Sequence, residues 1–104
     1  MKELLEELKT IDPACYDEIA RGLGQVDIEY EEDIIQGACQ RAVAAQKWEF
    51  RLGSAMMDES KKGFYCAIMH RVSSMWLDLV VSKEAASAAE SILTAYIAAR
   101  KAQP

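Results

Sequence analysis

The sequence contains few of the residues that break or cross-link a chain. It has only two prolines and five glycines in 104 residues, and its three cysteines are an odd number with wide spacings. This composition disfavours disorder, and the cysteine spacing fits neither a disulfide framework nor a CxxC zinc pair. We therefore expect reduced thiols that pack as small hydrophobic side chains in a cytoplasmic protein.

Sequence signals for membrane insertion and for catalysis are also missing. No apolar run approaches the roughly 20 residues of a membrane span, and the acidic N-terminus does not resemble a secretory signal. Phosphate-loop, dinucleotide-binding and serine-hydrolase motifs do not occur. The sole histidine, His70, follows Ala67 where a di-iron bundle needs glutamate. We predict a protein that is not an enzyme, with no catalytic residue, no cofactor, no metal and no membrane contact.

The net charge of -5 is unevenly distributed along the chain. Residues 1–36 hold eleven acidic and three basic side chains, a net charge of -8, whereas residues 37–104 hold nine basic and six acidic ones, a net charge of +3. A superficial helix-turn-helix pattern would place the acidic residues of 29–33 against DNA, where phosphates repel them. We therefore expect no nucleic acid partner.

Apolar spacing predicts an all-α fold, a helical bundle with three long helices preceded by two short N-terminal helices. The five helices are expected at about residues 2–10, 13–21, 29–51, 55–81 and 83–102. Asp12 can cap the second helix, and Pro13 suits its first position. The length of the chain suits one shared core, so we expect a single helical-bundle domain over residues 1–104.

The expected helix at 55–81 is more apolar than a surface helix requires. Its apolar side chains sweep an arc of about 220° on a helical wheel, whereas about 100° is enough for a surface helix. Two architectures remain open at residues 80–84. Ser82 can cap a new helix and give a compact bundle, or a heptad seam from Tyr65 to Tyr96 can run through one long helix paired with a second chain. We expect self-association through the fourth and last helices, and thus a homodimer.

Basic, aromatic and sulfur-containing side chains gather where the third expected helix meets the fourth. Tryptophan, arginine and methionine are enriched at interface hot spots. The candidate partner-binding residues at this end are Lys47, Trp48, Arg51, Met56, Lys61 and Lys62. A purely structural interpretation competes, because cations are favourable at helix C-termini and Trp48 can belong to the core.

These patterns favour a small, non-enzymatic interaction module that acts as an adaptor or regulator for an unidentified protein partner. The alternative is a helical bundle that binds a small ligand or a metal through an apolar pocket near His70 and Cys66. These two residues are four positions apart, so in a helix they would face the same way. Met and aromatic residues at helical spacing are core more often than pocket, which ranks this alternative second.

Overall fold

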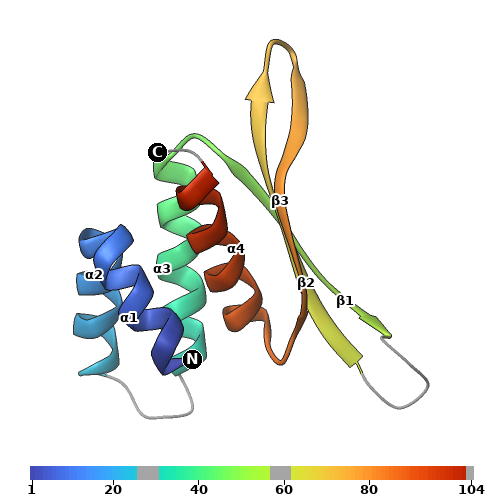
Figure 1. Cartoon of the computed structure of the whole chain (residues 1–104). Coiled ribbons are helices and arrows are strands. Elements are labelled where there is room, and N and C mark those ends of the chain that lie inside the picture. The colour runs from blue at the N-terminus through green and yellow to red at the C-terminus, as the bar shows by residue number, and fades with distance from the viewer. Residues whose placement is uncertain (26–30, 57–61, 103–104) are drawn as a thin grey trace.

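The structure, a computed structural model, describes residues 1–25, 31–56 and 62–102. In these residues, four helices lie on one side of a three-stranded antiparallel sheet with the strand order β1-β2-β3 (Figure 1). The elements are α1 (Lys2–Ile11), α2 (Pro13–Leu23), α3 (Glu31–Ala45), β1 (Glu49–Met56), β2 (Lys62–Val72), β3 (Met75–Ala85) and α4 (Ala88–Ala102). The all-α helical-bundle prediction is therefore wrong, because the chain from residue 49 to 85 builds a sheet.

The fourth expected helix, at residues 55–81, is replaced by strands. It corresponds to the end of β1, all of β2 and much of β3. The segment is apolar on both faces, and periodicity does not separate such a strand from a buried helix. Its β-branched and aromatic residues favour strands, but the turn between β2 and β3 is Ser73-Ser74, without glycine or proline. Because no glycine or proline marks this turn, the apolar spacing predicts one helix where the chain forms two strands.

Neither architecture expected at residues 80–84 is present. Ser82 lies inside β3, paired with Cys66 of β2. The last helix begins at Ala88 rather than 83, after a cap in which the Glu90 amide donates to Ser87 Oγ at 3.1 Å and the Ala86 amide donates to Glu90 Oε2 at 3.2 Å. The heptad seam does not exist, so self-association through a fourth and a last helix has no structural basis.

The chain before the sheet follows the expected pattern more closely. The helices expected at 2–10 and 13–21 are present as α1 and α2, and the Cys15 amide donates to Asp12 Oδ1 at 3.2 Å as the cap requires. The third helix ends at Ala45 instead of residue 51. The turn that ends it has Lys47 at a positive φ of 62°, with the Trp48 amide donating to the Val43 carbonyl at 3.1 Å. This is a Schellman motif, whose left-handed position normally holds glycine.

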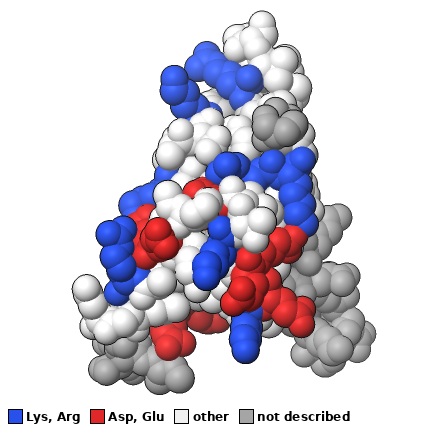
Figure 2. Space-filling view, turned by 60° about the vertical axis from the view of Figure 1, so that its left-hand side comes forward, with Lys and Arg blue, Asp and Glu red and all other residues white. Residues whose placement is uncertain are grey.

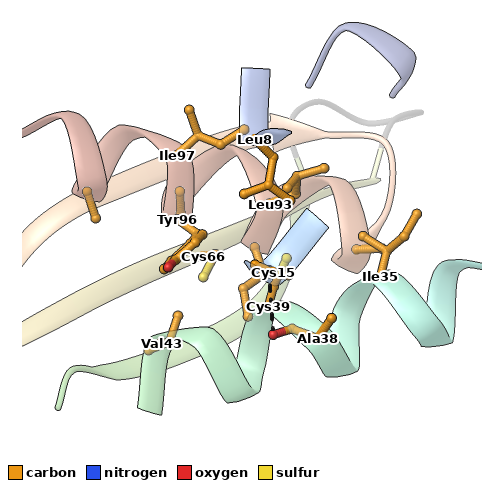
Figure 3. Close-up of a cluster of buried hydrophobic side chains, with 14 of the residues drawn as sticks. Leu8, Cys15, Ile35, Ala38, Cys39, Val43, Cys66, Leu93, Tyr96 and Ile97 are labelled. Carbon is orange, nitrogen blue, oxygen red and sulfur yellow. Dashed lines mark hydrogen bonds between the residues drawn. The ribbon is translucent and has the colours of Figure 1, made fainter. Parts of the chain in front are cut away.

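The core lies between the helices and the inner face of the sheet (Figure 3). The pairs Phe50↔Ile68 and Ile68↔Val80 place one residue of each strand side by side toward the helices. From α4, Leu93 and Tyr96 are fully buried against them. The cysteines of α2, α3 and β2 are free and buried in the same core, which confirms their expected role as small hydrophobic side chains.

Candidate functional site

The β2–β3 hairpin projects beyond the rest of the sheet. The first residue of β1, Glu49, pairs with Met69, so in the described structure the last residues of β2 pair with β3 alone. Figure 1 shows this end of the hairpin standing clear of α3 and α4. We call residues 70–77 the arm; they comprise the end of β2, the Ser73-Ser74 turn and the start of β3.

The arm carries large apolar side chains in contact with solvent. The exposed fractions are 45% for Val72, 61% for Met75, 45% for Trp76 and 43% for Leu77. Residues 72–77 include no charged side chain. Val72, Met75 and Leu77 share one face of the hairpin and Trp76 is on the other, because neighbouring residues of a strand point to opposite faces. Since monomeric proteins rarely expose large apolar patches without a functional reason, the arm is the first candidate for a functional surface.

The turn of the arm is held in a conformation that serine adopts rarely. Ser73 has a φ of 60°, and the Arg71 Nε donates to the Ser73 carbonyl at 3.3 Å. A positive φ at the first central residue suits the right-handed twist of a two-residue hairpin, although glycine is the usual residue there. The strands therefore stay paired up to the tip, which keeps the apolar side chains at the end of the hairpin.

An open groove of about 510 Å³ lies at the base of the arm. It is lined by Gln46, Lys47, Trp48, His70, Arg71 and Trp76. The first three come from the turn that ends α3 and leads into β1, and the others come from β2 and β3. The groove thus combines two indole rings with two cations, and no lining side chain is acidic.

Trp48 connects the groove to the core. It is half-buried, and its ring meets the Tyr96 ring edge to face, with centroids 6.3 Å apart and planes at 64°. Such edge-to-face pairs add to the burial of the two rings. One side of Trp48 is therefore fixed by α4 while another side lines the groove.

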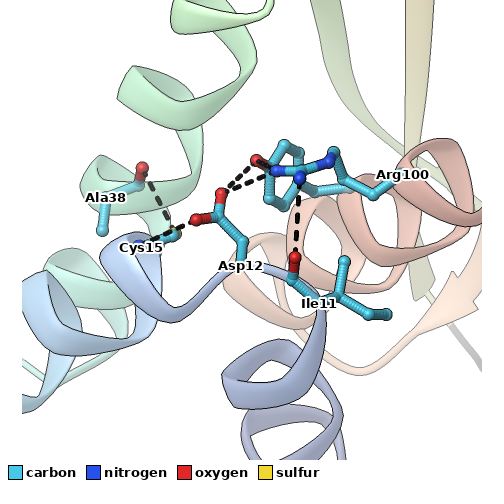
Figure 4. A network of polar contacts seen from close by, with 6 residues as sticks. Ile11, Asp12, Cys15, Ala38 and Arg100 are labelled. Atoms are coloured by element: carbon cyan, nitrogen blue, oxygen red, sulfur yellow. Dashed lines mark hydrogen bonds and ion pairs between the residues drawn. The ribbon is translucent and has the colours of Figure 1, made fainter. Parts of the chain in front are cut away.

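A polar network with Asp12 and Arg100 holds Tyr96 in place, and Figure 4 shows Asp12 and Arg100 in this network. The Tyr96 hydroxyl donates to Asp12 Oδ2, and Arg100 Nη1 donates to Asp12 Oδ2 at 3.0 Å and to the Tyr96 oxygen at 2.8 Å. Burial, and then the hydrogen bond to Asp12, raise the pKa of Tyr96 well above its usual value. A tyrosine hydroxyl is protonated at neutral pH in any case, and the raised pKa keeps it a hydrogen-bond donor at mildly alkaline pH as well.

The six residues predicted as a partner-binding patch do not form one patch. Lys47 and Trp48 meet in the groove, and Arg51 is exposed on β1, paired with Ala67. Met56 and Lys62 pair with each other at the opposite end of β1, about 25 Å away along an eight-residue strand. Lys61 lies outside the described residues.

The pocket predicted near His70 and Cys66 is not present as such. In a strand, residues four positions apart are separated by about 13 Å, so these two side chains cannot ligate one metal ion. Cys66 is fully buried, and burial raises the pKa of its thiol to about 12, whereas His70 lines the groove. In the part of the chain that the structure describes, no group of three potential ligand residues is placed to hold a metal ion.

Charge differs between the arm and the helical layer. At the height of the arm, Figure 2 shows uncharged and basic side chains together, whereas the acidic side chains in this view lie further down. The acidic residues of α1, α2 and α3 include Glu3, Glu6, Asp17, Glu32 and Asp33, all of them exposed. The acidic charge of the first third of the sequence is therefore also concentrated on the helical side of the structure.

Sequence reasoning missed the arm and half of the groove. The residues of the arm lie within the segment 55–81, which the apolar spacing predicts as one helix. The only local signal is weak: two serines, without glycine or proline, separate runs rich in valine, isoleucine and aromatic residues. Arg71 and Gln46 reach the groove through the sheet register and the end of α3, which no local pattern reveals.

Comparison with known proteins provides no relative. The chain matches no protein family, no curated protein and no solved structure. Among the described residues, no helix combines the length and apolar character needed to cross a membrane. The functional argument therefore depends on the geometry of the arm and the groove.

Proposed function

We propose that this protein is a non-enzymatic interaction module, an adaptor or regulator, that forms a homodimer through its arm. The observation that carries the proposal is the exposure of Val72, Met75, Trp76 and Leu77 at the end of a projecting hairpin. Methionine and tryptophan are enriched at interfaces, and the central residues of an interface are depleted in charge. The arm has this composition.

The arm is costly to leave uncovered. A two-stranded hairpin without further support is only marginally stable in water, and the arm extends past the strand and helix that support its base. An exposed apolar edge strand also invites association with other chains. Contact with another chain would both support the hairpin and bury its exposed apolar edge.

A second copy of the chain is the partner that the arm fits best. Each copy brings an identical tip, residues 72–77, with no charged side chain, and a twofold axis lets the same apolar surface contact itself. In the described sheet, β3 pairs with β2 alone, so its outer edge has main-chain groups for further pairing. Self-association therefore needs no surface other than the arm and the start of β3.

The proposed role requires no chemistry and leaves the helical layer for other contacts. The acidic side chains of α1, α2 and α3 are on the helical side, so a dimer joined by its arms still presents them to a further protein partner. A cytoplasmic location belongs to the same proposal. It is supported by three buried free thiols, which fit a reducing compartment.

Sedimentation velocity over a range of concentrations tests the proposal. We expect the wild-type protein to form dimers, and Met75→Ser to weaken the dimer about tenfold to a hundredfold, as loss of 1.4–2.8 kcal/mol requires. The matched pair Val72→Ser and Val81→Ser sharpens the test, because the two valines are 45% and 46% exposed but only Val72 is in the arm. A wild-type monomer at every concentration, or an equal effect of Val81→Ser, contradicts the proposal.

A further inference from the structure

We infer that the groove at the base of the arm binds a small anion attached to a flat ring, such as a nucleotide or an aromatic carboxylate. The groove volume of about 510 Å³ is in the range of small-molecule sites. The groove and the proposed dimer surface share Trp76, but Lys47 and Arg71 take no part in the dimer argument, so variants at these two residues test the groove separately.

The aromatic half of the site comes from the two tryptophans of the sequence, which both line this groove. Indole rings offer flat surfaces on which a heterocycle or benzene ring stacks. The Trp48 ring is held in place by its edge-to-face contact with Tyr96, and Tyr96 is itself held by Asp12 and Arg100. The stacking surface is therefore preorganised, which lowers the cost of binding.

The charged half of the site consists of Lys47 and Arg71. Neither side chain has an ion-pair partner within the described residues, and no acidic residue lines the groove. A guanidinium presents a planar fork that matches carboxylate and phosphate oxygens, and an ammonium adds a compact charge. The terminal nitrogens of Arg71 remain available, because its contact with the turn is made through Nε.

The backbone at Lys47 is the third observation. With a φ of 62°, this residue occupies the left-handed position that ends α3, where glycine carries no steric penalty. A lysine here costs stability that a glycine would recover. Residues held in such conformations are often found at ligand sites. Keeping a cation at the rim of the groove at this cost fits a binding role better than a structural one.

Tryptophan fluorescence provides a direct assay, since both indoles line the groove. The protein is titrated with AMP and with nicotinate, each beside the uncharged compound with the same ring, adenosine and nicotinamide. We expect a saturable change for at least one anion with a Kd below about 1 mM. Binding of the uncharged compound should be at least about tenfold weaker. Tighter binding of AMP identifies a phosphate ligand, and tighter binding of nicotinate identifies a carboxylate ligand.

Variants separate a binding role from a structural one. Arg71→Met and Lys47→Asn should each weaken the anion about tenfold, whereas Arg51→Met, which removes an exposed arginine outside the groove, should leave binding unchanged. Lys47→Gly should weaken binding and raise the melting temperature together, a combination that a structural lysine does not give. Met75→Ser should weaken the dimer but leave the affinity for the anion unchanged.

Two results overturn the inference. One is that neither anion gives a saturable change, or that adenosine and nicotinamide bind as well as their charged counterparts. The other is that Arg51→Met weakens binding as much as Arg71→Met, which reduces the effect to overall charge. Failure of the dimer proposal appears separately, in sedimentation, so the two proposals are distinguishable.

Discussion

The inner face of the β2–β3 hairpin passes through two different environments. At its base, Ile68 is fully buried beneath the helices and pairs with Val80. At its tip, Val72 pairs with Met75, and these side chains are 45% and 61% exposed. Apolar side chains on the same two strands are thus buried in the core at the base of the hairpin and exposed to solvent at its tip. The difference shows that the hairpin is longer than folding of the helical layer requires.

The largest expected effect on stability comes from a matched pair of leucines, one in the core and one in the arm. Leu93→Ala, in the fully buried part of α4, should lower the free energy of unfolding by about 2–5 kcal/mol. Leu77→Ala, at a leucine that is 43% exposed, should lower it by less than about 1 kcal/mol in the monomer. Chemical denaturation measures both values. Equal losses would show that the arm is part of the folding core.

A polar residue of the core gives the next largest effect. Asp12 caps α2, accepts from Tyr96 and pairs with Arg100, with side chains only 16% and 26% exposed in the ion pair. Asp12→Ala should therefore cost about 2–4 kcal/mol, because the cap is lost and the remaining partners are left unsatisfied.

Glu18→Ala provides the control for Asp12→Ala. Glu18 pairs with Arg41 in an ion pair whose side chains are 37% and 64% exposed. Exposed pairs contribute little, so the loss should be below about 1 kcal/mol. Thermal and denaturant unfolding of the two variants check the contrast. A larger loss for Glu18→Ala would mean that the network around Tyr96 does not hold α1 and α4 together.

Alkaline pH should weaken the core before it affects the arm. Burial raises the pKa of Cys66 from 9.0 to about 12, and the pKa of Tyr96 is also raised. The unfolded chain loses these protons at lower pH than the folded one, so stability is complete below about pH 9 and falls as pH rises from 9 toward 12, by up to about 1.4 kcal/mol per pH unit and group. Denaturation from pH 8 to 10.5 should show this decline.

Cys66→Ala tests whether the Cys66 thiol causes the loss of stability at alkaline pH. It lowers stability at neutral pH because a buried side chain is truncated, but it should also flatten the alkaline slope. An unchanged slope would show that Cys66 does not contribute, and the decline would then belong to other groups of the core such as Tyr96.

The smallest effect concerns the tip of the arm. Ser73→Gly should raise the free energy of unfolding by up to about 1 kcal/mol, because glycine adopts the positive φ of 60° without steric cost. Ser74→Gly, at the other turn position, should lower it slightly, because Ser74 has no positive φ and glycine only adds freedom to the unfolded chain. Melting temperatures of the two variants distinguish the outcomes, and a gain from Ser74→Gly instead would contradict the turn geometry.

The sequence was sufficient where local chemistry decides the structure. Asp12 and Pro13 mark the boundary between α1 and α2, because a capping carboxylate and a residue without an amide proton suit one site only. The last helix was also recognised, apart from its start. In each case the signal lies within a few residues of the feature that it predicts.

The sheet could not be derived in this way because its determinants are long-range. Residues 62–85 carry apolar side chains on both faces of the hairpin, so a strand pattern is not separated from a helical one. Only the pairing of Ile68 with both Phe50 and Val80 selects strands. The groove could not be predicted from local patterns either, because Lys47 and Arg71 are far apart in the sequence and come together only through the strand pairing.

Hydrogen–deuterium exchange of the arm tests the central claim most directly. Peptides that cover residues 70–77 should exchange slowly when the protein is concentrated and rapidly after dilution, while peptides from α4 exchange slowly at both concentrations. This result would place the dimer interface on the arm. Rapid exchange of the arm at both concentrations, in a protein that sedimentation shows to be dimeric, would place the interface elsewhere and contradict the account.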